Sequence, residues 1–269
     1  MSKRNRKNNP NKKKTPVAVP DSLVPRAYEM GEALKKDKYL GKMFEFTAST
    51  GKVLVRFAFA EEGKSPSAVN MIFTNVMALA SQFIDERQND PSIACKAGCN
   101  FCCHMKVTAS PIEILTLGLN LDAKLSPGDA KEIKERIKIN ADKTKALTAH
   151  EHANANIPCA LLDRDGKCSM YEYRPMNCRR WLSFSKEACE TAFKTSMGKG
   201  RVPIDGNAFI VGLGIGDGLE EGLKEARLDF ESYELHTGLL RFLETSDAEA
   251  KWLRGEPVFQ GCKQSTAST

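Results

Sequence analysis

The distribution of apolar positions predicts helices along most of the chain. After Ser65 and Pro66, apolar residues recur every three or four positions as far as Ile84. That period matches one face of an α-helix, and serine followed by proline is a common helix start because the hydroxyl can cap free amides. We therefore expect an amphipathic helix of about 20 residues that ends near Asn89, shortly before Cys95.

Similar signals predict helices on both sides of this one. Ser110 with Glu113 is typical of a capping box, and Ser126 with Asp129 repeats the start signal. The predicted helices cover 26–40, 110–119, 126–150, 185–196, two stripes over 219–230 and 235–242, and a last short helix capped by Ser246 and Glu249 that ends at Gly255.

Two segments have other patterns. Between Met43 and Phe59, apolar residues alternate around a Ser-Thr-Gly centre, which favours a β-hairpin, with a helix as the alternative. Between Val211 and Gly218, glycine occupies every second position from Gly212 onward. This spacing differs from the G-x-G-x-x-G of dinucleotide-binding loops, so we interpret the run as a flexible turn before a helix.

These elements predict a mainly α fold, in which a helical domain holds irregular, cysteine-rich metal-binding knuckles, with at most one small β-hairpin. The chain has 269 residues, of which 41% are hydrophobic, and this is enough to build a core. We expect a disordered basic tail over 1–20, a single globular domain over 21–262 with its cysteine cluster at 94–182, and a disordered C-terminus over 263–269.

The net charge of +6 comes from the N-terminal tail. The seven Lys and Arg residues between positions 3 and 14 exceed the whole net charge, and residues 1–20 contain no acid. A polar tail without interleaved aromatics indicates solvated chain, with at most weak contacts to nucleic acid. No signal peptide is evident, and no apolar run reaches the roughly 18 residues of a membrane helix, so we expect a cytoplasmic protein without membrane contacts.

Cysteine is the residue type that indicates chemistry. The first cysteine segment, residues 95–104, and the second cysteine segment, residues 158–179, hold seven of the nine cysteines. In a reducing compartment, clustered thiols are typical of metal or redox sites, and thiolates select zinc, Cu(I) or iron–sulfur clusters. The candidate metal ligands are Cys95, Cys99, Cys102, Cys103, Cys159, Cys168 and Cys178.

Seven thiols are too many for one zinc ion, which takes four ligands in a tetrahedron. The adjacent side chains of Cys102 and Cys103 also diverge, so they are poorly placed to bind the same ion. We therefore predict two centres, the first held by Cys95, Cys99 and Cys102, and the second by Cys103, Cys159, Cys168 and Cys178.

Thiolates around a metal ion need positive charge or hydrogen-bond donors nearby. Arg174 and Arg179 are candidates to donate to the sulfurs, as is the hydroxyl of Tyr171, with surface ion pairs and ordinary packing as the alternative. His104 follows the first segment's thiols as a candidate nitrogen ligand, although a lone histidine is more often only hydrogen-bonded. We interpret Cys189 and Cys262, outside both segments, as buried structural thiols.

The two segments resemble the YkgJ-type cysteine-cluster family, whose signature is C-x-x-C-x-x-C-C and which is described as a zinc- or iron-chelating domain. The resemblance covers roughly 94–182 and departs from the signature at the first spacing, which is three residues here. It implies that the cysteines chelate metal. Some flagellin lysine methylases resemble the family too, so an iron–sulfur-dependent enzyme acting on protein side chains is the alternative function. The matching residues are Cys95, Cys99, Cys102, Cys103, Pro158, Cys159, Leu161, Leu162, Gly166, Cys168, Tyr171, Arg174, Pro175, Cys178 and Arg179.

The first segment also satisfies another spacing. Cys95, Cys99 and Cys102, with Phe101 before the last, match the C-x₃-C-x-aromatic-C pattern by which radical-SAM enzymes hold a [4Fe–4S] cluster. That fold requires alternating strands and helices, whereas only helices are predicted after Cys103. The cluster remains a candidate cofactor beside zinc or iron, and a protein substrate is a candidate partner only under the enzymatic alternative.

Overall fold

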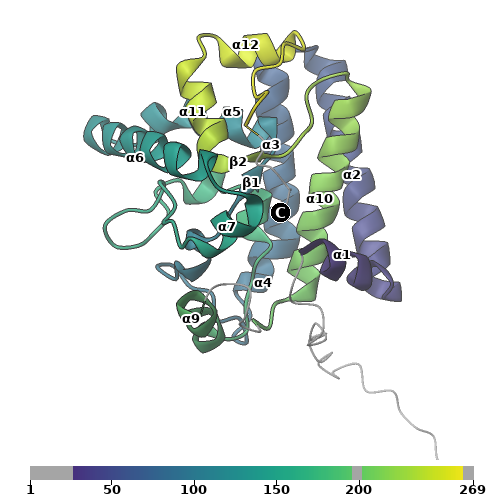
Figure 1. Ribbon diagram of the computed structural model, residues 1–269. Helices are drawn as coiled ribbons and strands as arrows, with labels where there is room; N and C mark the ends of the chain where they lie inside the picture. The colour runs from purple at the N-terminus through teal and green to yellow at the C-terminus, as the bar shows by residue number, and fades with distance from the viewer. Residues whose placement is uncertain (1–26, 196–201, 263–269) are drawn as a thin grey trace, which may run out of the picture.

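Among the described residues, the regular secondary structure is almost entirely helical, which confirms the predicted mainly α fold (Figure 1). The computed structural model describes residues 27–195 and 202–262, so the predicted tails over 1–20 and 263–269 lie outside the described residues. Within these ranges the only sheet is one short antiparallel pair, which gives no support to a radical-SAM barrel.

The helices and strands have the following bounds: α1 Ala27–Lys35, α2 Lys38–Glu62, α3 Pro66–Ala80, a π-helical turn Ser81–Asp85, α4 Glu86–Gln88, a 3₁₀ turn Phe101–His104, β1 Thr108–Ala109, α5 Pro111–Lys124, α6 Pro127–Lys145, α7 Ala149–Asn154, a 3₁₀ turn Tyr171–Tyr173, α8 Met176–Arg179, α9 Lys186–Lys194, α10 Gly206–Glu225, β2 Tyr233–Glu234, α11 Leu235–Glu244 and α12 Ala248–Leu253.

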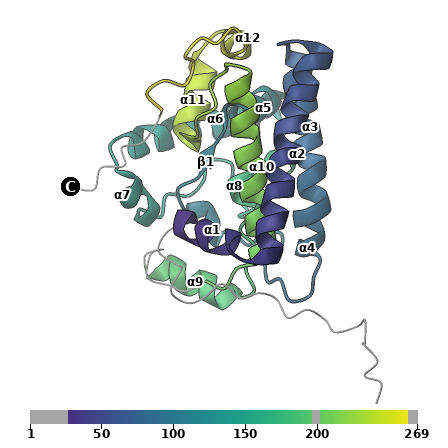
Figure 2. The same cartoon turned by 90° about the vertical axis from the view of Figure 1, so that its right-hand side faces the viewer.

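The two longest helices, α2 and α10, lie side by side in both views (Figures 1 and 2). Glycines of α10 make the approach close. A Cβ at Gly218 would overlap the carbonyl oxygen of Ala48, and farther along a Cβ at Gly222 would lie 2.6 Å from the Cβ of Val55. From the first contact to the second, residue numbers rise along both helices, so the two helices run parallel. The prediction of a flexible turn over 211–218 is therefore wrong, because these glycines let two helices pack.

The segment predicted as a β-hairpin, 43–59, lies in the middle of α2, so the helical alternative is correct. Thr47, Gly51, Val55 and Ala58 are buried at helical spacing. Exposed apolar residues of the same helix, such as Phe46, Val53 and Phe57, lie between the buried ones in the sequence and produce the alternating pattern that favoured strands. Tertiary packing of α2 against α10 decides between the two patterns.

The helix predicted after Ser65 is confirmed. The Ser65 side chain accepts the amide hydrogen of Ala68, and α3, the π-helical turn and α4 together reach Gln88. By length and composition this helix, Pro66–Gln88, would suffice to cross a membrane, which the sequence analysis had not expected. Its inner face, which includes Ile72, is part of the main hydrophobic core.

Helices α5 and α6 begin at the predicted caps. Ser110 and Glu113 each accept the other's backbone amide hydrogen, which closes the capping box. However, α6 ends at Lys145, before the predicted end near residue 150. Thr148 and Glu151 form a second capping box that begins α7, so local capping interrupts the expected long helix.

The short sheet connects the first cysteine segment to the C-terminal helices. Residue Thr108 of β1 lies opposite Glu234 of β2, directly before α11. The predicted stripe over 235–242 lies within α11, and the last helix, α12, forms as expected before Gly255, which has a φ of 80°. Its predicted serine cap is absent, because Asp247, with a φ of 53°, precedes the helix without a side-chain cap.

Candidate metal centre

The two cysteine segments, far apart in the sequence, lie against each other as predicted. The amide of Cys159 donates a hydrogen bond to the carbonyl oxygen of Cys103, at 2.8 Å. A Cβ at Gly166, which has a φ of 74°, would overlap the side-chain amide of Asn100. The turn of the second segment therefore fits closely on the first, and only glycine allows this approach.

Cys95 lies in a first group of thiols with Cys99, Cys102 and Cys189. Its Sγ accepts the amide hydrogen of Ser183 at 3.2 Å. Burial raises the pKa of the Cys95 thiol to about 11, and negative charge on the other three cysteines raises it further. The interpretation of Cys189 as a buried structural thiol is wrong, because this residue is only partly buried and α9 carries it beside the first segment. Its position in the sequence, outside any knuckle spacing, contained no signal for this.

A second group contains Cys159, Cys168 and Cys178. Burial raises the pKa of Cys178 well above its usual value, and charges on Cys159, Cys102 and Cys168 act in the same direction. Burial likewise raises the pKa of Cys168, to about 11. Cys102 interacts with both groups and shares a hydrogen bond with Cys103, which raises its pKa. The eight thiols are therefore neighbours, and Cys102 connects their two halves.

Backbone amides point at sulfurs in both segments. The thiol of Cys99 has a hydrogen bond with the amide of Phe101, and that of Cys168 with the amide of Met170. In each case the donor is two residues beyond the cysteine, and both bonds lower the thiol pKa against the larger effect of burial. Such donors stabilise thiolates and are a usual feature of sulfur-ligated metal sites.

Arg174 is the predicted counter-charge that lies near the thiols. Its positive charge lowers the pKa values of Cys102, Cys168 and Cys178, although burial or the Cys103 hydrogen bond has the larger effect. The guanidinium lies 3.4 Å from the centroid of the Tyr171 ring, and Nε donates to the Tyr171 carbonyl oxygen at 3.1 Å. These contacts hold the arginine in place.

The other two predicted partners of the sulfurs bond elsewhere. The Tyr171 hydroxyl donates to Gln88 Oε1 at 3.1 Å, so the expected donation to sulfur is not observed. Arg179 is buried and pairs with Asp85 at 3.1 Å, and it also donates to the carbonyl oxygen of Glu172 at 2.6 Å. A buried guanidinium needs a charged partner and several acceptors, which explains why Arg179 holds the loop instead of the thiols.

His104 is hydrogen-bonded rather than directed at the thiols. Its Nδ1 lies 3.0 Å from the carbonyl oxygen of Asn100, and its ring centroid lies 4.8 Å from that of Phe193. The contacts of His104 therefore fit the predicted alternative, a histidine that is only hydrogen-bonded. Cys262 lies outside the thiol groups, where its Sγ donates to the carbonyl oxygen of Thr237 at 3.6 Å, in agreement with a structural role.

The donor set fits zinc or iron by its chemistry. Its ligands are soft sulfurs, three of which, those of Cys95, Cys99 and Cys168, have amide donors, and a guanidinium lies beside three. Among the described residues no three Cys, His, Asp or Glu side chains yet converge closely enough to hold one ion. Binding therefore requires the thiols to turn toward a shared point and to lose protons, which burial keeps on sulfur until a metal displaces them.

Comparison with known proteins agrees with this description. Residues 94–195 match the family model described as "CxxCxxCC: Putative zinc- or iron-chelating domain". No curated protein and no solved structure matches the chain. The matched range contains both cysteine segments and α9, and it ends before α10. Residues 94–195 of this chain therefore match the CxxCxxCC family model, as the resemblance of the two cysteine segments predicted.

Proposed function

We propose that the protein binds zinc or iron at two adjacent centres of four sulfurs each. The first would use Cys95, Cys99, Cys102 and Cys189. The observation that carries the proposal is the arrival of Cys189 beside the first cysteine segment, which provides the fourth sulfur that a closed site requires. The second centre would use Cys103, Cys159, Cys168 and Cys178.

The residues around the thiols support the same function. Four thiolates around a divalent ion leave a net charge of about −2, which is unfavourable in a desolvated site. Arg174 would offset part of this charge at the second centre, and the amides of Phe101 and Met170 would stabilise one thiolate in each centre. All nine cysteines are free thiols, and we propose a reducing compartment, the cytoplasm, as the location.

Metal analysis of anaerobically purified protein tests the proposal. We expect about two zinc ions per chain and no colour if the centres hold zinc, or several irons per centre, brown absorbance and acid-labile sulfide if they hold iron–sulfur clusters. The second result would favour the enzymatic alternative. Protein that contains no transition metal and binds none on addition would refute the function.

Two serine variants identify the sulfurs involved. Cys189→Ser should remove about one metal equivalent, because three thiolates no longer close the first centre. Cys262→Ser is the matched control, since this buried thiol also lies outside both cysteine segments but contacts Thr237 instead of the cluster. Full metal loading of Cys189→Ser, or equal loss in both variants, would contradict the assignment of Cys189.

A further inference from the structure

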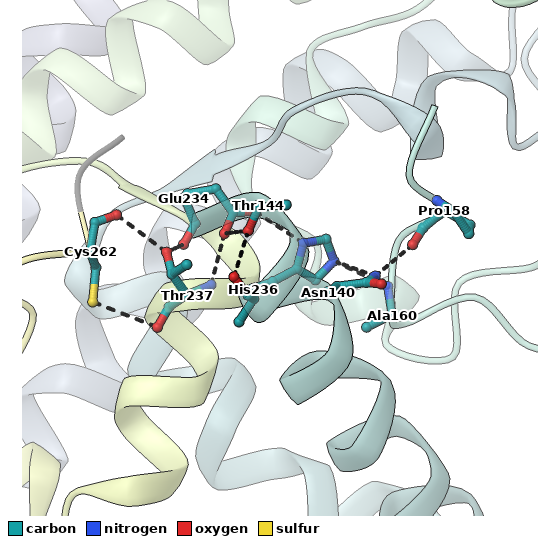
Figure 3. Close-up of polar contacts among 9 residues, drawn as sticks. Asn140, Thr144, Pro158, Ala160, Glu234, His236, Thr237 and Cys262 are labelled. Atoms are coloured by element: carbon teal, nitrogen blue, oxygen red, sulfur yellow. Dashed lines mark hydrogen bonds and ion pairs between the residues drawn. The ribbon is translucent and has the colours of Figure 1, made fainter. Parts of the chain in front are cut away.

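A polar network holds the backbone of the second cysteine segment on both sides of Cys159 (Figure 3). The side-chain amide of Asn140, on α6, donates to the carbonyl oxygen of Pro158 at 2.7 Å. The amide of Ala160 donates to Nε2 of His236, on α11, at 3.2 Å. Cys159 therefore lies between two residues whose backbone groups are both fixed by buried side chains.

His236 is itself fixed in orientation. Its Nδ1 lies 3.0 Å from Oε1 of Glu234, and both residues are almost fully buried, with exposed fractions of 4% and 1%. The other carboxylate oxygen accepts hydrogen bonds from the amide of Thr237 at 2.8 Å and from the hydroxyl of Thr144 at 3.3 Å. The imidazole ring cannot turn without breaking this chain of bonds. Carboxylate–imidazole pairs commonly orient groups around metal sites in the same way.

The hydrogen bonds define which nitrogen carries the proton. A proton on Nε2 would remove the lone pair that accepts the Ala160 amide. In the observed arrangement Nδ1 therefore carries the ring proton and donates it to Glu234.

We propose that Asn140, His236 and Glu234 are positioning residues that hold Cys159 where it can join the second metal centre. The inference rests on the proposed function and extends the site to α11, beyond the family match at 94–195. These residues bind no metal in this account. Glu234 also lies opposite Thr108 on β1, a few residues after Cys103, so the same network ties both cysteine segments to the helices.

Titration with Co²⁺ alone, under anaerobic and reducing conditions, tests the proposal. Thiolate-to-cobalt charge-transfer absorbance reports the number of bound sulfurs. In His236→Leu we expect this absorbance to fall by between about one eighth, for one lost thiolate, and about one half, for a lost centre. His236→Gln, whose side-chain oxygen can still accept the Ala160 amide, should recover most of the signal. Asn140→Leu, which removes the other support, should resemble His236→Leu.

Controls separate positioning from general destabilisation. Trp252→Phe removes a hydrogen bond from a buried side chain to the carbonyl of Asp229, which involves none of the proposed metal ligands, and should lower stability without changing the cobalt spectrum. If both His236→Leu and Asn140→Leu bind cobalt like the wild type, the inference is wrong. If the wild type itself binds no cobalt, the proposed function fails instead.

A separate feature is the exposed apolar face of α2, here called the α2 stripe. Its members are spaced by seven, seven and four residues and lie on one side of the helix, away from α10. Figure 1 shows α2 at the edge of the molecule. The stripe consists of Tyr39, Phe46, Val53 and Phe57, with exposed fractions of 56%, 55%, 56% and 51%.

We infer that a second copy of the chain packs antiparallel on the α2 stripe. In one register, Phe46 lies opposite Val53 of the copy, and Lys42 lies opposite Phe57 of the copy. Lys38 and Lys42 are near one end of α2, while the other end carries Glu61 and Glu62, so reversal of the copy brings opposite charges together. The exposed halves of the three aromatic rings on two copies provide roughly 600 Å² of apolar surface, about half of a small specific interface. The flanking residues would supply the remainder of a reversible dimer.

Light scattering after size-exclusion chromatography tests this inference. We expect mass to rise toward the dimer with concentration and the dimer to weaken in high salt, which screens the end charges. Phe46→Lys combined with Val53→Lys should give a monomer. Leu119→Lys is the control, because this residue is also exposed, at 47%, but lies on α5. A wild type that is monomeric at every concentration, or a dimer unaffected by the double substitution, would overturn the inference.

Discussion

The close contact of α2 and α10 predicts that a single methyl group at Gly218 destabilises the fold. A Cβ there would overlap the carbonyl oxygen of Ala48 and lie 2.9 Å from the amide nitrogen of Lys52. Both are backbone atoms of α2, so no side-chain rotation relieves the overlap. The two helices would have to separate along an interface that buries Thr47 and Val55.

Two opposing effects, helix propensity and overpacking, determine how much Gly218→Ala changes the free energy of unfolding. Replacing a glycine inside a helix by alanine stabilises by about 1 kcal/mol through helix propensity. Overpacking a close interface costs about 1–3 kcal/mol, and a clash with rigid backbone lies at the upper end. We therefore expect Gly218→Ala to lose about 2 kcal/mol. Gly216→Ala, two positions away on the same helix, should gain about 1 kcal/mol, because no atom lies within 4 Å of its Cβ.

Urea unfolding followed by far-ultraviolet circular dichroism measures the difference. The two variants carry the same substitution in the same helix, so they differ only in what the new methyl group meets. All proteins should be compared at equal metal content, because bound metal shifts apparent stability. The reasoning is refuted if Gly218→Ala is as stable as Gly216→Ala.

Three further predictions concern charge and metal. The Glu234 carboxylate has a pKa of about 2, because its bonds to His236 and Thr237 outweigh burial, so it stabilises the fold above its usual pKa of 4.5. This stability, roughly 3 kcal/mol at most, should be lost as pH falls from about 5 to 2, and Glu234→Gln should flatten that loss in acid unfolding. Arg174→Gln should speed metal transfer to a competing chelator, with Arg174→Lys intermediate; unchanged rates would contradict a charge-compensating role. Metal removal should lower the melting temperature of the wild type and of Cys262→Ser equally, as calorimetry can check.

Local signals explain why much of the helical structure was predictable. Ser65, Ser110 and Ser126 act within four residues of themselves, so their capping is readable without any knowledge of the fold. Helix α2 and the glycines of α10 were misread for the opposite reason. Their patterns make sense only when each helix has the other as a neighbour, and neither sequence segment contains that information.

The same division applies to the candidate site. By itself, the sequence determined the sulfur chemistry and its two segments, because metal-knuckle spacing is a local property of the chain. Only the tertiary structure brought Cys189 to the first segment, turned Arg179 toward Asp85, and placed His236 beside Cys159. These are contacts between residues distant in sequence, and they follow from how helices pack and from the need of buried charged and polar groups for partners.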